Sequence, residues 1–319
     1  MQHVTSSSPL LLSLFFLLCS ASCSTIQSPL EQKKSELPIP PEGSDEDIEV
    51  SSTQAPESPC PTPFMTVSEE MCKDTSSSYG LSAETPAEWG FGAGTRTLWF
   101  GRLTCPSGAM AEITHIESIE ASTTSSTQKS PMATEEPDVI DIWEVNCPGT
   151  TPPTKIFHNM YRCGNPCPPQ GTKLLPAAAY QLYIESYKAH EAAAHEDALE
   201  LARQAYEQAP NFELLTLWLA LLSHESGYYQ DAINLYADVL TFKPSDTFSK
   251  LQQAILYNAI NQPEDALLIT EPLLNSLTRE DPAYSDALCA HATALMSSEP
   301  NQAKLMAIEA CSAGTKACC

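Results

Sequence analysis

Two histidines, His190 and His195, stand in a segment that resembles part of a zinc-protease signature. The segment reads HEAAAH, and the chemistry of that signature requires two histidines at positions i and i+4, one helical turn apart, with a glutamate beside the first. Here the histidines are five residues apart, which separates them by roughly 140° around a helix. The spacing therefore does not predict a metal site, and we expect both side chains to be exposed near a turn between helices.

A second group, His158, Cys163 and Cys167, carries side chains of the types that bind zinc. Tetrahedral zinc sites need four ligands, usually with tighter cysteine spacing, so disulfide bonding of the cysteines is the favoured interpretation. The sequence contains no serine-hydrolase, phosphate-loop or dinucleotide motif. We therefore expect no metal, no cofactor and no enzymatic activity.

The chain has 12 cysteines among 319 residues, which few intracellular proteins carry without metal motifs. The six between residues 60 and 167 are expected to form disulfides, but their connectivity stays open. Cys289 and Cys311 would lie on the two helices of one helix pair, either bonded to each other or as two buried thiols. The adjacent Cys318 and Cys319 do not bond each other comfortably and would pair elsewhere or with another molecule. The cysteines predicted to form disulfides are Cys60, Cys72, Cys105, Cys147, Cys163, Cys167, Cys289 and Cys311.

An apolar segment near the N-terminus predicts export. Residues 10–18 read LLLSLFFLL, which is too short to span a bilayer but fits the apolar region of a signal peptide. The residues before Cys23, Ser-Ala-Ser, resemble a bacterial lipobox, so Cys23 is predicted to carry lipid after removal of residues 1–22. Setting Cys19 and Cys23 aside leaves ten cysteines, an even number that can pair completely. Cleavage without lipidation is the alternative.

The charge of the chain limits its partners. With 16 Lys and Arg against 40 Asp and Glu the net charge is −24, and a phosphate backbone would be repelled, so no nucleic-acid partner is expected. Residues 23–59 are rich in Pro, Ser and acidic residues and show no hydrophobic period. They predict a disordered tether, which would hold the folded part away from a membrane if Cys23 is lipidated.

Residues 60–171 predict a small antiparallel β-domain held by disulfides. The segments LTCPSG and VNCPGT both place a Cys-Pro turn after an aromatic-containing run, which favours two related hairpins. Residues 118–136 have low complexity and predict a long mobile loop. Strands are expected from length and aromatic content at residues 97–105, 139–147 and 154–163.

From residue 173 onward the pattern is helical, with a repeat of 34 residues. Ala198, Ala232 and Ala266 recur at this interval, and so do Pro210 and Pro244. A small alanine lets two helices cross closely, and proline ends the second helix of a pair. The recurrence resembles the tetratricopeptide (TPR) family, whose repeat is 34 residues long. The resemblance covers residues 177–312 and implies helix pairs at roughly 177–210, 211–244, 245–278 and 282–312.

The TPR resemblance also implies a binding face for a protein or peptide. In that family the first helix of each pair lines a concave groove, and the matching positions here lack the Lys and Arg pairs of carboxylate-clamping relatives. The alternative is that this face is covered by the cysteine-rich domain or is ordinary core. The matching positions are Tyr180, Tyr183, Tyr187, His190, Leu214, Leu217, Leu221, His224, Phe248, Leu251, Ile255 and Asn258.

Together these features predict a mixed fold, in which a disulfide-rich antiparallel β-domain precedes an all-α TPR-like array at residues 172–319. The predicted function is an exported protein-binding scaffold of the bacterial cell envelope, either a lipoprotein of the periplasm or outer membrane or a secreted protein. A second interpretation is that the array supports the β-domain, which binds the partner. A secreted enzyme is the third.

Overall fold

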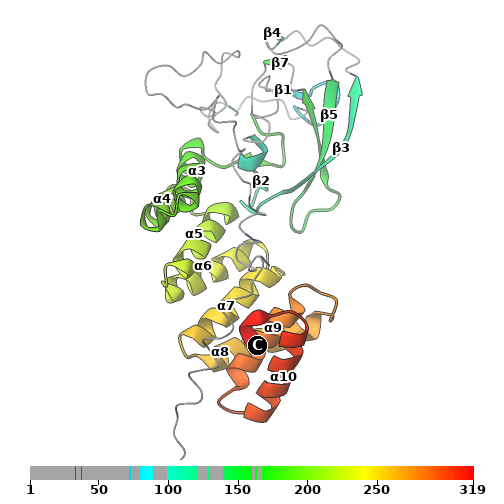
Figure 1. Ribbon diagram of the computed structural model, residues 1–319. Coiled ribbons are helices and arrows are strands. Elements are labelled where there is room, and N and C mark those ends of the chain that lie inside the picture. Colours follow the sequence, from blue (N-terminus) through cyan, green and yellow to red (C-terminus); the bar gives the residue numbers. More distant parts are fainter. Residues whose placement is uncertain are drawn as a thin grey trace, which may run out of the picture. The chain divides into compact units, whose positions relative to one another are not determined.

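The computed structural model describes residues 33, 37, 72, 79–88, 99–120, 128–129, 139–159, 162–163 and 167–319. The described residues from 72 onward belong to one compact unit, which holds both the strands and the helices (Figure 1). The predicted signal peptide, Cys23 and nearly all of the tether lie outside the described residues, so export and lipidation stay predictions. Cys60 also lies outside them, and no side chain is described for Cys163.

The largest sheet has four strands in the order β1-β6-β5-β3. Strand β5 (Val139–Asn146) lies between β3 (Glu112–Glu120) and β6 (Thr154–Asn159) and is antiparallel to both. Strand β1 (Ala87–Glu88) runs parallel to β6. The strands predicted at residues 139–147 and 154–163 are thus confirmed, the second of them as β6 and the short β7 (Arg162–Cys163), with residues 160–161 outside the described part.

The strand predicted at residues 97–105 is wrong for most of its described residues, which begin at Trp99. Residues 99–102 form a helical turn, and only β2 (Leu103–Thr104) is a strand, which pairs with β8 (Lys173–Leu174). Residues three apart in a helical turn face the same side, so Trp99 and Arg102 are both buried here. A strand would point these two side chains to opposite faces.

The loop predicted at residues 118–136 begins later than expected. Strand β3 continues to Glu120, and β4 (Gln128–Lys129) pairs with β7 (Arg162–Cys163). The remaining residues of that loop lie outside the described part. Within β3 the register shifts between His115 and Glu117, where a bulge accommodates Ile116.

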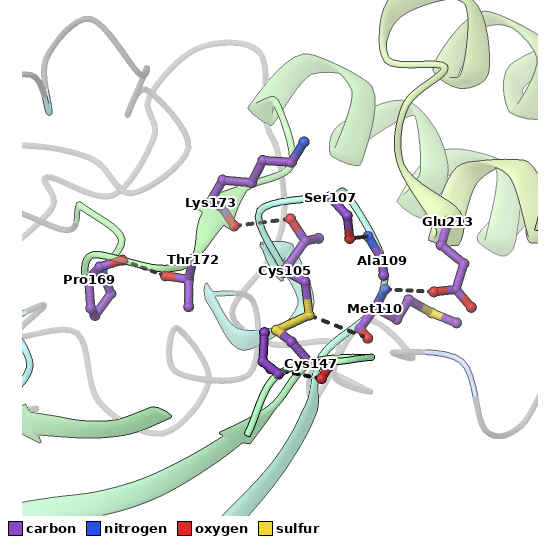
Figure 2. Close-up of a disulfide and its surroundings, with 11 residues drawn as sticks. Cys105, Ser107, Ala109, Met110, Cys147, Pro169, Thr172, Lys173 and Glu213 are labelled. Atoms are coloured by element: carbon purple, nitrogen blue, oxygen red, sulfur yellow. Dashed lines mark hydrogen bonds between the residues drawn. A yellow bond between two sulfur atoms is a disulfide. The ribbon is translucent and has the colours of Figure 1, made fainter. Parts of the chain in front are cut away.

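The two Cys-Pro turns are joined by the Cys105–Cys147 disulfide (Figure 2). In the first turn the Gly108 amide donates to the Cys105 carbonyl at 2.9 Å. In the second, between β5 and β6, the Thr150 amide donates to the Cys147 carbonyl at 3.0 Å. Each turn connects strand-like segments, as the two sequence motifs predict. A second disulfide joins Cys72 to Cys167, so four of the predicted disulfide cysteines of the β part are bonded.

The helical array consists of four helix pairs, as predicted (Figure 1). Ala198, Ala232 and Ala266, the residues that reveal the repeat, are completely buried in the second helix of their pairs. Gly227 has a left-handed backbone with φ +80°, which a glycine in the turn between two helices adopts without strain. The pairs are α3 (Ala177–Glu191) with α4 (His195–Gln208), α5 (Glu213–Glu225) with α6 (Tyr229–Phe242), α7 (Thr247–Ala259) with α8 (Pro263–Ser276), and α9 (Tyr284–Leu295) with α10 (Pro300–Ser312).

A C-terminal tail is bonded to both helices of the last pair. Cys289 of α9 bonds Cys318, and Cys311 of α10 bonds Cys319. The predicted bridge between Cys289 and Cys311 is therefore wrong, and so is the alternative of two buried thiols. The tail turns back after Gly314, and the short helix η4 (Lys316–Cys318) brings Cys318 to α9. The prediction that the adjacent cysteines pair elsewhere is confirmed.

Candidate protein-binding face of the helical array

All of the predicted groove residues lie on α3, α5 and α7, the first helices of three successive pairs. Half of them are buried and form the core beneath the face, namely Tyr180, Tyr183, Leu214, Leu217, Leu221 and Leu251. The other half are partly exposed, namely Tyr187, His190, His224, Phe248, Ile255 and Asn258. A partner can touch only this second set without disturbing the core. We call these six residues the candidate face.

Trp218 of α5 organises the aromatic end of the candidate face. The rings of Tyr187 and His190 both lie 5.6 Å from its ring, and Tyr183 meets it edge-on at 5.8 Å. The buried Nε1 of Trp218 donates to Ser186 Oγ at 2.8 Å, and Ser186 Oγ donates to the Ala198 carbonyl at 2.6 Å. This chain of bonds fixes α5 against α3 and α4. The predicted set omits Trp218, although α5 is apolar on all sides, a pattern that indicates burial all round.

His190 is held at this end by a carboxylate. Its Nε2 lies 3.0 Å from Glu225 Oε2 of α5, so the pair links the C-terminal ends of α3 and α5. His195 begins α4, and the turn between the helices brings its ring within 5.6 Å of the His190 ring. The two histidines therefore lie on different helices, and the five-residue spacing reflects the turn between them.

The α7 end of the candidate face combines an apolar and a polar side chain. Ile255 packs on the core formed by Leu251, Leu273 and Ala287. The amide nitrogen of Asn258 donates to the Ala290 carbonyl of α9 at 2.9 Å, which fixes the orientation of the side chain. Within the described part of the chain, Asn258 Oδ1 accepts no hydrogen bond. It can therefore accept one from the backbone amide of a bound segment.

The β part covers the start of α3. A side-chain carbon at Gly101 would meet the hydroxyl of Tyr180, and Arg102 Nε donates to the Leu175 carbonyl at 2.8 Å. Burial raises the pKa of the Tyr180 hydroxyl, although the charge of Arg102 opposes that rise. Burial likewise lowers the pKa of Arg102 to about 10, against the effect of Tyr180. Both groups therefore keep their usual protonation at neutral pH, and this end of the predicted groove is closed.

A second joint lies where the first Cys-Pro turn meets α5 (Figure 2). The buried Glu213 accepts the Met110 amide at 2.8 Å through Oε2, and its own amide donates to the Gly108 carbonyl at 3.0 Å. Nearby, Lys173 Nζ lies 4.4 Å from the centre of the Phe212 ring. These contacts attach the disulfide-bonded turns to the second helix pair.

A polar cluster on the sheet has residue types that the sequence did not single out. Ser118 Oγ donates to Asp141 Oδ1 at 2.7 Å, and His115 Nε2 lies 3.3 Å from the same serine oxygen and 3.7 Å from Asp141. In a catalytic triad the carboxylate holds the other ring nitrogen of the histidine and leaves the serine to the histidine. Here the serine hydroxyl donates its hydrogen bond to the carboxylate and not to the histidine, so the arrangement does not activate the serine.

The zinc interpretation of His158, Cys163 and Cys167 is not supported, because Cys167 is bonded to Cys72. Among the residues that the structure describes, no group of three or more histidine, cysteine or acidic side chains is placed to hold a metal ion. In the same residues, no helix has the length and apolar character that crossing a membrane requires.

No protein-family model matches the sequence, and no curated protein matches it. Several solved structures are similar. MamA (residues 41 to the end) from Desulfovibrio magneticus RS-1 is 17% identical, with 44% of this chain and 77% of that chain covered and a TM-score of 0.39. YrrB, described as a TPR protein with an unusual peptide-binding site, is 15% identical over 44% and 70% of the two chains, with a TM-score of 0.39. A tetratricopeptide repeat protein from Parabacteroides merdae is 20% identical over 44% and 54%, with a TM-score of 0.37.

Proposed function

We propose that this chain is a protein-binding scaffold whose candidate face holds an extended segment of a partner protein. The observation that carries the proposal is the row of six partly exposed residues on the first helices of three successive pairs. Stacked helix pairs present such rows as one extended surface. Aromatic and aliphatic side chains there bury apolar side chains of the partner, and Asn258 Oδ1 accepts a backbone amide.

The chemistry of the face indicates which segments fit. It carries no Lys or Arg, so it offers no clamp for a terminal carboxylate. His190 Nε2 lies 3.0 Å from Glu225 Oε2, so this ring nitrogen already has an acidic partner within the chain. The net charge of −24 disfavours acidic partners. We therefore propose an internal, apolar segment that is neutral or basic.

The binding proposal is tested by site-specific photo-crosslinking. A photoreactive residue at Ile255 of the full chain should capture a partner whose crosslinked segment is identified by mass spectrometry. The matched control is Leu268 of α8, which is 75% exposed but not on the candidate face. A synthetic peptide of the captured segment should bind the Ile255→Asp variant at least about tenfold more weakly than the parent. Equal loss in Leu268→Asp, or no loss in Ile255→Asp, contradicts the proposal.

We also propose that the chain is exported to the bacterial cell envelope and anchored by lipid on Cys23. The signal-like residues 10–18 support export, and the four disulfides of the described part suit an oxidising compartment. A Cys23→Ser variant should move from the membrane fraction to the soluble fraction. A variant that fractionates as the parent does indicates simple secretion.

A second candidate function is favoured by the joint between Glu213 and the first Cys-Pro turn. A buried carboxylate that accepts a backbone amide fixes the β part on the array, as expected if the array supports a β part that binds the partner. A photoreactive residue at Glu117 of β3 distinguishes the two functions. Capture there, with none at Ile255, favours the β part.

A further inference from the structure

Strand β3 has only one neighbour in its sheet. It is the last strand in the order β1-β6-β5-β3 and, at nine residues, is longer than its partner β5. Within the part of the chain that the structure describes, no strand pairs with its outer edge, and its residues form no ladder except the one with β5. Its outer edge therefore carries backbone N–H and C=O groups that are available to another extended chain.

The side chains of β3 leave this edge accessible. Seven of its nine residues are exposed, and only Ile113 and Ile119 are partly buried. Ile116, at the bulge, is 45% exposed and is the apolar residue that projects most from the strand. An added strand would thus find unpaired backbone along the edge and one apolar contact near its centre.

The charges on β3 determine which chain fits. The strand carries Glu112, Glu117 and Glu120 and no Lys or Arg. Of these three glutamates, Glu112 alone forms an ion pair with another described residue, Lys243 at 3.5 Å. If two copies of β3 paired antiparallel about Ile116, Glu112 of each copy would lie opposite Glu120 of the other. Like charges directly opposite each other destabilise a strand pair, so self-pairing is disfavoured. A basic strand would instead place positive charges opposite these glutamates, which stabilises the strand pair.

We infer that the outer edge of β3 is a docking site, distinct from the candidate face, that accepts an extended basic segment of a partner protein as an added strand. Backbone hydrogen bonds supply the affinity, as in other cases of strand addition. Basic side chains opposite Glu117 and Glu120 select the partner, and an apolar side chain contacts Ile116. Because these charges are exposed, the affinity should fall as salt rises.

The test uses a nine-residue fluorescent peptide of Lys and Val, the same length as β3, and its Glu and Val counterpart. The peptide carries Lys on both faces, because Glu117 and Glu120 point to opposite faces of the strand. Fluorescence anisotropy with the full chain should show binding of the basic peptide only. The Glu117→Lys, Glu120→Lys double variant should bind it at least about tenfold more weakly and should gain affinity for the acidic peptide. The matched control, Glu196→Lys with Glu264→Lys on exposed positions of the array, changes the net charge equally and should bind as the parent does, apart from a small uniform weakening.

General attraction between a basic peptide and an acidic chain is separated from strand addition by N-methylation. One peptide carries N-methyl groups along one edge, and a second carries them along the other, so both keep their charges. Strand addition predicts that only one of the two loses about tenfold or more in affinity. Equal binding of both methylated peptides, or equal weakening in the control variant, overturns the inference. Circular dichroism and the unchanged content of disulfides confirm that each variant is folded.

Discussion

In the helical array each helix packs mainly on its neighbours along the chain, whereas in the β part several contacts join segments that are far apart in the sequence. The disulfides of the β part span 95 and 42 residues, and β2 pairs with a strand some 70 positions later in the sequence, with Leu103 opposite Leu174. The alanines of the array recur every 34 residues and pack on helices that are neighbours along the chain, as Ala266 does with Ala254 of α7 and Ala294 of α9. Local contacts leave a period in the sequence, and distant contacts do not.

The largest effect that tests this comparison is removal of the long-range disulfide. Replacing Cys72 and Cys167 by serine should destabilise the β part by about 4–5 kcal/mol, because a closed loop of this length restricts the unfolded chain strongly. The matched control removes the Cys311–Cys319 bond, which spans 8 residues, and should cost about 2–3 kcal/mol. Urea unfolding followed by tryptophan fluorescence and circular dichroism measures both. Equal losses would contradict the distinction between the two regions.

A smaller effect is expected at the joint between the regions. Gly108 has φ +91°, and a side-chain carbon there would meet the carbonyl oxygen of Asn211. Gly108→Ala should cost about 2–4 kcal/mol, from the left-handed backbone and from strained bonds to Glu213. Gly149 has φ +76° but open space around it. Gly149→Ala should therefore cost only the backbone strain, about 1–2 kcal/mol. If urea titrations gave similar losses of stability for Gly108→Ala and Gly149→Ala, the backbone around Gly108 would be able to shift and accommodate the added carbon.

The smallest effect concerns pH and lies within the array. Burial lowers the pKa of His291 below its ordinary value of 6.5, although Glu271 and Glu299 oppose this. Thr270 Oγ1, which donates to the Ala266 carbonyl, lies 2.8 Å from His291 Nδ1, so the neutral ring donates to it. As pH falls below 6.5 the unfolded state takes up a proton before the folded state does. The array should then lose stability on acidification and keep it above that pH.

The pH effect is measured from urea midpoints at about pH 7.5 and about pH 5.5, values on either side of the ordinary histidine pKa. His291→Gln should remove part of the difference between the two midpoints. The control His195→Gln, at an exposed position, should leave the difference as it is. If the difference between the two urea midpoints is unchanged in His291→Gln, the acid sensitivity comes from other groups.

The parts of the fold that the sequence could predict are those built from local contacts. The buried Ala198, Ala232 and Ala266 marked the helix pairs correctly, because each belongs to a repeated local contact. The helical turn at residues 99–102 was not predicted, because the hydrogen bonds that hold it are made between Arg102 and Leu175, which is far along the chain. The Ser118–Asp141 bond was equally hidden, since it depends on a bulge that changes the register between two strands.

The candidate site was predicted in part. The helical period placed all of the predicted residues on first helices, and the positions of the partly exposed His190 and Asn258 followed from it. The same period could not show that Tyr180 is covered, because the covering residue is Gly101 of the β part. Nor could the period predict that Trp218 contacts both Tyr187 and His190, because these contacts depend on how closely α3 and α5 pack.

The two bonds of the C-terminal tail set an order in time for making this protein. A chain that is synthesised or exported N-terminus first presents Cys289 and Cys311 before Cys318 and Cys319 have emerged. During that interval the thiols of Cys289 and Cys311 can form disulfides with cysteines other than Cys318 and Cys319. The bonds close only when every helix of the array has already appeared, so a chain in which both have formed carries the whole array, whereas an open Cys289 or Cys311 would be labelled by an alkylating reagent.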